Sequence, residues 1–245
     1  MMNAQLISLS REISLRRELD VVANNLANIN TTGFQAESLL FEDYRMPVAR
    51  ASAFRMGDRP LAYVRDWATV RDTTAGRFEM TGNPLDVAID GDAYLVVDTP
   101  EGERFTRNGS FQRSPDGMIV NQQGLPVMGL DGPIYLLPED SEISIAPDGT
   151  VTTDNGPRGR LRLVEFDNEQ AMERVGNNLL TGEDPQPSEF GRVMQGVIEG
   201  SNVQPISEIS RMIEIQRAYE MQARMVRDAD GLRRNAIERL GSLDA

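Results

Sequence analysis

The chain has 245 residues, 40% of them hydrophobic, and a formal net charge of −13. It contains no histidine and no cysteine, and all 25 basic residues are arginine. These absences exclude catalysis by an imidazole, a thiolate or a Schiff-base amine, and also zinc or copper sites built from histidine and cysteine. The acidic charge argues against nucleic acid and anionic membranes as partners. The length allows one large domain or two small ones.

The charge is distributed unevenly. Residues 1–30 carry three arginines and three acids, and residues 206–245 carry seven of each, so the net charge lies between the two ends. Neutral ends can pack against copies of themselves without repulsion, although a chance distribution is the alternative. No apolar run approaches the ~20 residues of a membrane helix, and the first ten residues lack the features of a secretory signal. We therefore expect no direct membrane insertion and no cleaved signal peptide.

Residues 1–29 are expected to form an amphipathic helix. Apolar residues recur three and four positions apart, first at Leu6, Leu9 and Ile13. After a phase slip the pattern continues at Leu15, Leu19, Val22, Leu26 and Ile29. This spacing indicates a coiled-coil seam, although an ordinary core-facing helix has the same spacing. Gly33 is expected to stop the helix.

Three asparagines lie close together near the end of this helix. At ~100° per residue, Asn24 and Asn28 share the side opposite the apolar stripe, with Asn25 on one flank. Asparagine is a poor helix former because its amide competes for backbone hydrogen bonds. Either the helix frays into a capped end here, or these amides bond to something outside the pair of terminal helices.

The middle of the chain, residues 76–175, is expected to be a β-rich domain. Apolar and polar residues alternate from Leu85 to Asp90, and the run from Tyr94 to Val97 is typical of a buried strand. The segment 114–124 resembles the segment 146–156, and each begins with a Pro-Asp-Gly turn. This weak repeat predicts two similar hairpins.

The segments 34–75 and 176–202 have no clear period and are expected to be extended connectors. The first is too aromatic for a flexible linker. It contains the aromatic residues Phe41, Tyr44, Tyr63 and Trp67, which we expect to anchor it.

The acidic residues are the remaining candidates for chemistry. The groups Asp86, Asp90 and Asp92, and Asp148 with Asp154, hint at calcium binding, but neither group has the spacing of an EF-hand loop. Some carboxylate pair suited to glycoside hydrolysis always exists among 38 acids, but nothing in the sequence selects one. We therefore expect no catalytic, cofactor-binding or metal site. A glycan-binding β-module and a carboxylate-based hydrolase stay as competing classes.

Residues 206–240 are expected to form a second amphipathic helix. One face contains Met212, Ile215, Tyr219, Ala223, Val226, Ala229, Leu232, Ala236 and Leu240. Tyr219 in this stripe favours packing over chemistry. The expected fold is therefore α+β, with the terminal regions 1–33 and 203–245 paired as a coiled-coil domain and an antiparallel β-rich middle.

Short motifs at both ends and in the middle are the most specific features. The first is Asn24-Asn25-Leu26-Ala27-Asn28, followed by Thr31-Thr32-Gly33-Phe34. The second is Glu199-Gly200-Ser201-Asn202-Val203, followed by Met212-Ile213 and Gln216-Arg217-Ala218-Tyr219-Glu220. The middle contains Gly82-Asn83-Pro84-Leu85-Asp86-Val87-Ala88-Ile89-Asp90-Gly91 and Phe105-Thr106-Arg107-Asn108-Gly109. Together they resemble the family of flagellar axial proteins, which comprises basal-body rod, hook and hook-associated proteins.

Within that family the length and the segment Asp66-Trp67-Ala68-Thr69 are most similar to a proximal subunit of the rod. The start, Met1 to Arg17, and the run Ala93-Tyr94-Leu95-Val96 depart from many relatives, which leaves a distal rod or hook subunit as the alternative.

The resemblance implies a structural protein without cofactors. Its terminal helices would form an inner coiled-coil domain that polymerises into a helical tube, and its β-domain would lie outside. It also implies export through the flagellar type III apparatus and assembly with copies of itself and with other rod subunits. The location would be the rod of the basal body, which spans the periplasm.

The expected assembly interface lies on both terminal helices and on the motifs beside them. A two-helix seam without neighbours buries little area, so we expect the ends to be disordered in the monomer. The interface residues are Leu19, Val22, Asn24, Asn25, Leu26, Ala27, Asn28, Ile29, Thr32, Gly33, Phe34, Asn202, Met212, Ile213, Ile215, Gln216, Arg217, Tyr219 and Val226.

Overall fold

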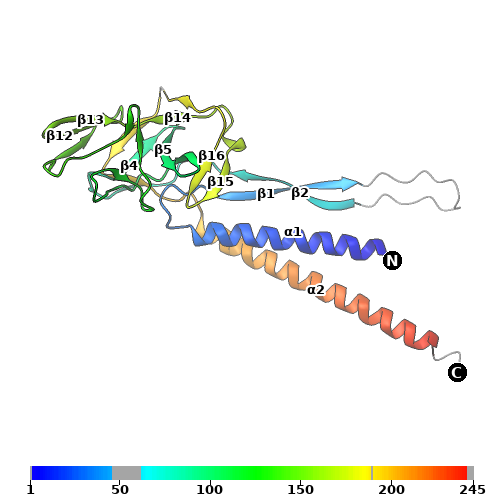
Figure 1. The fold of residues 1–245 in the computed structure, drawn as a ribbon. Helices are drawn as coiled ribbons and strands as arrows, with labels where there is room; N and C mark the ends of the chain where they lie inside the picture. Colours follow the sequence, from blue (N-terminus) through cyan, green and yellow to red (C-terminus); the bar gives the residue numbers. More distant parts are fainter. Residues whose placement is uncertain (1, 46–61, 189, 242–245) are drawn as a thin grey trace. The chain divides into compact units, whose positions relative to one another are not determined.

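The computed structural model describes residues 2–45, 62–188 and 190–241 (Figure 1). An N-terminal helix, a β-rich middle and a C-terminal helix follow one another, which confirms the α+β class. The chain divides into two compact units. The helical unit comprises Met1–Ala27, Glu37–Val70 and Gln204–Ala245, and the β-rich unit comprises Asn28–Ala36 and Arg71–Val203.

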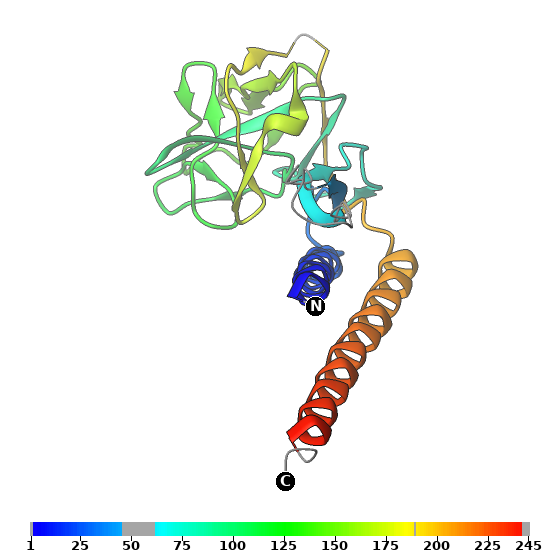
Figure 2. The same cartoon turned by 90° about the vertical axis from the view of Figure 1, so that its right-hand side faces the viewer.

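The helical unit contains two helices and a two-stranded sheet. Helix α1 is Met2–Ala27 and helix α2 is Pro205–Gly241, so the predicted ends are correct to within two residues. The sheet pairs β1 (Glu37–Arg45) with β2 (Ala62–Arg71). The two helices run in opposite directions and diverge toward the N-terminus of α1 and the C-terminus of α2 (Figures 1 and 2). No described helix is long and apolar enough to span a lipid bilayer.

Helix α1 buries the face that begins after the phase slip. Val22 is fully buried on this face, whereas Leu9 and Ile13 are 52% and 54% exposed. At ~100° per residue these two side chains lie on the side of the helix away from Val22. The prediction of one continuous seam is therefore wrong for the first run, because the phase slip moves it to a different face. The side chain of Leu6 lies outside the described residues.

Helix α2 follows the predicted stripe for its first six turns. Ile215 is buried, and Met212, Tyr219, Ala223 and Val226 are partly buried. Farther along, Ala229 and Leu232 are exposed, because α1 has diverged from α2 there (Figure 1). The side chains of Ala236 and Leu240 lie outside the described residues.

The β-rich unit is built from antiparallel strands, as predicted, throughout its described residues. Its largest sheet has the order β15-β16-β6-β5-β14-β17, and a three-stranded sheet has the order β11-β12-β13. The six strands of the first sheet are β15 (Glu173–Gly176), β16 (Leu179–Thr181), β6 (Gly102–Thr106), β5 (Tyr94–Thr99), β14 (Leu163–Glu165) and β17 (Gln186–Pro187). The three of the second are β11 (Ile143–Ile145), β12 (Thr150–Thr153) and β13 (Gly156–Arg160).

Four smaller sheets complete this unit, together with one turn of 3₁₀ helix at Glu169–Ala171. The pairs are β3 (Phe78–Met80) with β19 (Val197–Glu199), β4 (Val87–Asp90) with β18 (Arg192–Gln195), β7 (Gln112–Arg113) with β8 (Ile119–Val120), and β9 (Met128–Gly129) with β10 (Gly132–Pro133).

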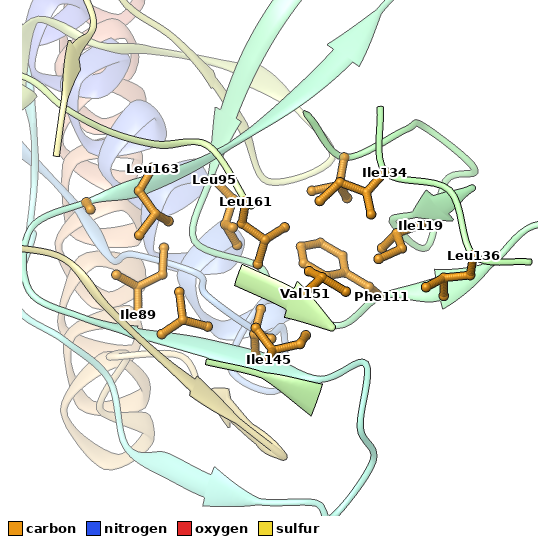
Figure 3. Packing of buried hydrophobic residues seen from close by; sticks show 14 residues of the cluster. Ile89, Leu95, Phe111, Ile119, Ile134, Leu136, Ile145, Val151, Leu161 and Leu163 are labelled. Atoms are coloured by element: carbon orange, nitrogen blue, oxygen red, sulfur yellow. The ribbon is translucent and has the colours of Figure 1, made fainter. Parts of the chain in front are cut away.

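Two hydrophobic clusters lie on opposite faces of β5. Tyr94, Leu95, Val96 and Val97 are all fully buried, as the apolar run predicts. Because successive strand side chains point to opposite faces, Leu95 joins a large cluster with Phe111 (Figure 3), while Tyr94 and Val96 join a smaller one. This central strand therefore supports both cores.

The predicted pair of similar hairpins is present. β7 and β8 flank the turn that starts at Ser114, and β11 and β12 flank the turn that starts at Ala146. In each turn the glycine amide donates to the first residue's carbonyl, over 2.9 Å for Gly117 and 2.8 Å for Gly149. The φ angles of these glycines are +85° and +84°, which only glycine adopts without strain.

The segment 34–75, expected to be an extended connector, contains β1 and β2. Of the aromatic residues expected to anchor it, Phe41 has an exposed side chain. The side chains of Tyr44, Tyr63 and Trp67 lie outside the described residues.

Candidate assembly site

Asn25 joins all parts of the helical unit. Its side chain is 2% exposed, and Nδ2 donates to the Glu37 carbonyl over 2.8 Å while the Glu37 amide donates to Oδ1 over 3.0 Å. The same Nδ2 donates to Oε2 of Glu208 over 3.1 Å. The amide thus pairs with β1 as a peptide group would, and it also binds the first turns of α2. Asparagine suits this position because it combines a donor and an acceptor on a short side chain.

The other two asparagines differ from Asn25. Asn24 has an exposed side chain, as expected from its position opposite the stripe. Asn28 follows the last helical residue, and its Oδ1 accepts a hydrogen bond from Thr31 Oγ1 over 3.1 Å. Asn28 therefore belongs to the turn that follows α1, and its side chain bonds within that turn.

Polar contacts set the register of α1 against α2. Tyr219 Oη donates to Glu12 Oε1 over 3.1 Å, and Arg211 forms an ion pair with Glu18 over 3.0 Å. Together with the Asn25–Glu208 bond, these contacts describe an antiparallel pairing, because α2 advances as α1 recedes. Tyr219 thus also makes a polar contact, which the helical spacing alone did not predict.

The predicted interface residues divide between the two sides of the helices. Val22 and Ile215 are buried, and Leu19, Leu26, Ile29, Met212 and Val226 are partly buried. Ala27, Ile213, Gln216 and Arg217 are exposed. Apart from Ile29, which belongs to the β-rich unit, the first group packs within the helical unit, and the second group is exposed on its surface.

In the β-rich unit, three chain segments meet at a site that we call the junction, residues 31–36, 71–77 and 199–203. The Gly33 amide donates to the Glu199 carbonyl over 2.7 Å, and the Asn202 amide donates to the Phe34 carbonyl over 3.2 Å. The Asn202 side chain connects all three segments. Its Oδ1 accepts from the Ala36 amide over 2.7 Å, and its Nδ2 donates to the carbonyls of Asp72 (2.8 Å) and Thr74 (2.9 Å).

A buried ion pair anchors the junction. Glu199 and Arg107 are 2% and 3% exposed and are 2.9 Å apart from Oε2 to Nε. Oε1 of Glu199 accepts from the Gly76 amide over 3.1 Å. The terminal nitrogens of Arg107 donate to the carbonyls of Ile89, Gly91 and Ala93. Both charges are therefore hydrogen bonded, as burial requires, and removal of either partner would leave a buried charge uncompensated.

The motif residues before the junction also lie in tight surroundings. Phe34 is buried, and the Arg174 guanidinium lies 4.2 Å from the centre of its ring. Asn178 Nδ2 donates to the Thr32 carbonyl over 2.8 Å. Gly33 has a φ of +65°, and a Cβ atom there would lie 2.5 Å from the carbonyl carbon of Arg107. Gly33 therefore permits a close backbone approach as well as the helix stop that the sequence predicts.

Sequence reasoning placed neither Arg107 nor Glu199 in the site. Both belong to motifs quoted above, but their pairing joins positions 92 residues apart. The available signal was a charged residue at the end of an apolar strand, Val197-Ile198-Glu199, which requires a buried partner.

Three of the acidic residues considered for calcium accept hydrogen bonds from nearby polar side chains. Asp86 accepts from Asn83, Asp148 from Thr150 and Asp154 from Ser141. In the described part of the chain, no three acidic, histidine or cysteine side chains are grouped to hold a metal ion. The Arg158 guanidinium beside Asp140 holds the pKa of that carboxyl far below its usual range, with further hydrogen bonds from Asn155, Leu137 and Thr153.

Models of three protein families match the chain. Residues 6–35 match the family described as flagella basal body rod protein. Residues 88–153 match the D1 domain of flagellar hook protein FlgE/F/G, and residues 194–239 match the C-terminal region of flagellar basal body rod FlgEFG proteins.

Curated relatives match over nearly the full length. The flagellar basal-body rod protein FlgF of Caulobacter vibrioides is 40% identical over 99% of each chain, and that of Mesorhizobium japonicum is 34% identical over 99% of each chain. FlgF of Salmonella typhimurium is 37% identical over 86% of this chain and 87% of the relative. The basal-body rod protein FlgG of Caulobacter vibrioides is 32% identical over 86% of this chain and 89% of the relative.

Proposed function

Because the chain belongs to the FlgF family of flagellar basal-body rod proteins, and is thus a structural rod subunit and not an enzyme, we propose that it polymerises through its terminal helices. The product is a helical tube that transmits torque. The subunit occupies the proximal rod, where it contacts copies of itself and other rod subunits. It reaches this place through the flagellar type III export apparatus, without a cleaved signal peptide.

Exposed apolar residues on α2 support this proposal. Helix α1 covers the side of α2 that contains Ile215 and Gln222. Two other stripes are exposed, one at Ile206, Ile209 and Ile213 and the other at Met221, Met225 and Leu232. At ~100° per residue they occupy two different sides of the helix, so α2 offers apolar surface to two further neighbours. Leu9 and Ile13 give α1 a corresponding outer face.

Charge favours the same arrangement. The ends carry equal numbers of arginines and acids, so terminal helices from many subunits can be bundled without net repulsion. The two exposed stripes of α2 differ in sequence and position, so each meets a different surface of its neighbour. Such heterologous contacts propagate as a helix and do not close into a dimer. The covered side then pairs α1 and α2 as an antiparallel coiled coil.

The side of α1 that contains Asn24 supplies polar contacts to neighbouring subunits, and the following turn contributes Asn28. The motivating observation is that Asn24 is exposed at the end of a helix in which asparagine is unfavourable. Normal assembly and unchanged motility of the double variant Asn24→Ala with Asn28→Ala would refute this role.

The polymerisation proposal is tested by placing a charge on the exposed stripe. Ile213→Asp should abolish assembly of the purified chain, as measured by sedimentation and electron microscopy at increasing concentration. Leu137→Asp is the matched control, because Leu137 is an exposed leucine of the β-rich unit. Equal assembly of the two variants would contradict the proposal.

The location is tested in cells that lack the gene. Purified basal bodies should end within the rod and carry no hook, and the point of truncation identifies the layer. Ile213→Asp should reproduce this defect on complementation, whereas Leu137→Asp should restore rods. Complete rods and hooks in the deletion strain would overturn the assignment.

A further inference from the structure

When the chain is pulled from its two ends, two segments of the junction are the first parts of the β-rich unit in the line of force. Residue 28 continues directly into α1, and residue 203 is followed by Gln204 and α2. The segments 31–36 and 199–203 are hydrogen bonded to each other through Gly33 with Glu199 and through Asn202 with Phe34 and Ala36. A pull on the two terminal helices therefore acts first on this pair of segments.

The two segments run in the same direction. Gly33 contacts Glu199, and three residues later along the second segment Asn202 contacts Phe34 and Ala36. A force applied at the start of the first segment and at the end of the second slides them past each other. All the hydrogen bonds between them are then strained at once and must break together, whereas bonds that are peeled apart break one at a time.

Further contacts prevent the segments from sliding. Glu199 is held by the buried Arg107, whose nitrogens also bind three carbonyls of the core. The Asn202 side chain is fixed to the segment 71–77 by two hydrogen bonds. Gly76, in the segment 71–77, packs closely on the segment 199–203. A Cβ atom at Gly76 would lie 2.0 Å from the Gly200 carbonyl oxygen.

We propose that the junction is a mechanical clamp that resists forces entering the β-rich unit through α1 and α2. Its biological use rests on the proposed transmission of torque, but the clamp is a property of the single chain. Asn202 and the Arg107–Glu199 pair are then positioning residues that hold two parallel segments in register under load.

The test is to pull single full-length chains in two directions. The natural chain has no cysteine, so introduced thiols are the only attachment points. Arg16→Cys with Asp228→Cys directs force through the helices, and release of residues 28–203 appears as a step of roughly 600 Å at ~3.4 Å per residue. Asp116→Cys with Glu183→Cys directs force across the β-rich unit and bypasses the junction.

A clamp and a merely stabilising contact give different results. In the terminal direction, Asn202→Ala should accelerate unfolding at constant force by about tenfold or more, because three hydrogen bonds are lost. Val151→Ala, a buried core substitution outside the junction, is the control and should act equally in both directions. Asn202→Asp keeps the acceptor for the Ala36 amide but places a carboxylate oxygen against the carbonyl oxygens of Asp72 and Thr74, so it should accelerate unfolding at least as much as Asn202→Ala.

Two outcomes would overturn the clamp. One is a natural chain that unfolds as easily in the terminal direction as across the β-rich unit. The other is an Asn202→Ala variant whose effect does not depend on direction, as for Val151→Ala. Because these measurements use monomers, they are independent of the assembly experiments with Ile213→Asp, and failure of either proposal leaves the other intact.

Discussion

Substitution of Gly33 by alanine should destabilise the β-rich unit far more than the same substitution at another glycine of similar conformation. Gly33 has φ = +65°, and Gly82 has φ = +73°. A left-handed backbone costs an alanine about 1–2 kcal/mol. Around Gly82 no atom lies within 4 Å of an added Cβ, so Gly82→Ala should cost about that amount.

At Gly33 a steric term is added. The new Cβ would lie 2.5 Å from the Arg107 carbonyl carbon and 2.6 Å from the Asn108 amide nitrogen. Both are backbone atoms of the buried residues Arg107 and Asn108, which lie beside the junction, and they cannot rotate away. Overpacking of this kind costs about 1–3 kcal/mol, and separation of the segments also weakens the 2.7 Å bond from the Gly33 amide to Glu199, worth about 1 kcal/mol. The total for Gly33→Ala is therefore about 3–6 kcal/mol.

Urea unfolding of both variants, followed by far-UV circular dichroism, measures the difference. The expected gap in the free energy of unfolding is about 2–4 kcal/mol, and the same gap should appear in the exchange of buried β5 amides. If Gly33→Ala were no more destabilising than Gly82→Ala, the close approach to Arg107 would not constrain the chain, and Gly33 would act only as a helix stop.

Three other outcomes follow from particular contacts. In assembled material, Asn25→Ala should speed hydrogen exchange of the Glu37 amide by about 30-fold, because about 2 kcal/mol of hydrogen bonding is lost. The control variant Asn24→Ala should leave the exchange of this amide unchanged. The lowered pKa of Asp140 adds stability that is fully present above the usual aspartate range near 4 and is lost as pH falls through the folded-state pKa. Urea unfolding at about pH 7 and pH 3 should therefore show less acid sensitivity in Asp140→Asn than in the natural chain, and an exposed control, Asp131→Asn, should retain it. In dilute monomer the amides of α1 should exchange rapidly, and slow exchange throughout residues 6–29 would contradict the expected disorder of the ends.

Local patterns were sufficient for the elements of secondary structure. Helix α1 was predicted because its apolar spacing and the stop at Gly33 are properties of a short segment. The hairpins at Ser114 and Ala146 were predicted for the same reason, because Pro-Asp-Gly defines a turn without help from distant residues. The buried run at Tyr94 was also correct, but its alternation between two cores could not be seen, since an all-apolar strand carries no period.

The faces of the helices could be predicted only in part. The sequence shows the phase slip before Leu15, but it does not show which run meets α2. That choice depends on where α2 lies, and the structure places α2 against the second run. Leu9 and Ile13 therefore appear in the sequence as one end of a seam and in the structure as exposed residues of the opposite face.

The polar contacts of the site were the least predictable, because their partners are distant or are backbone atoms. Asn25 binds a main-chain group of β1 and a carboxylate 183 positions away, and Arg107 binds Glu199 and three carbonyls. Helical geometry indicated Asn24 and Asn28 as the candidates for polar contacts, because it places them on the side opposite the apolar stripe. It could not reveal that the flanking Asn25 would meet the peptide group of Glu37 at the start of β1.

The junction and the outer faces of the terminal helices differ in what surrounds them, and this difference explains the arrangement of motifs at the ends of the chain. The junction residues Gly33, Glu199 and Asn202 are held by bonds that are complete within one β-rich unit, so their role does not require a neighbour. The outer faces of α1 and α2 expose Leu9, Ile213 and Met225, so the assembly role proposed for these faces requires a neighbouring subunit. A motif that spans residues 24–34 therefore combines a helix end suited to assembly with an anchor that is already formed in the single chain. Substitutions in this motif should therefore separate the two effects. Those before residue 28 should impair assembly, and those after residue 28 should impair folding or mechanical strength.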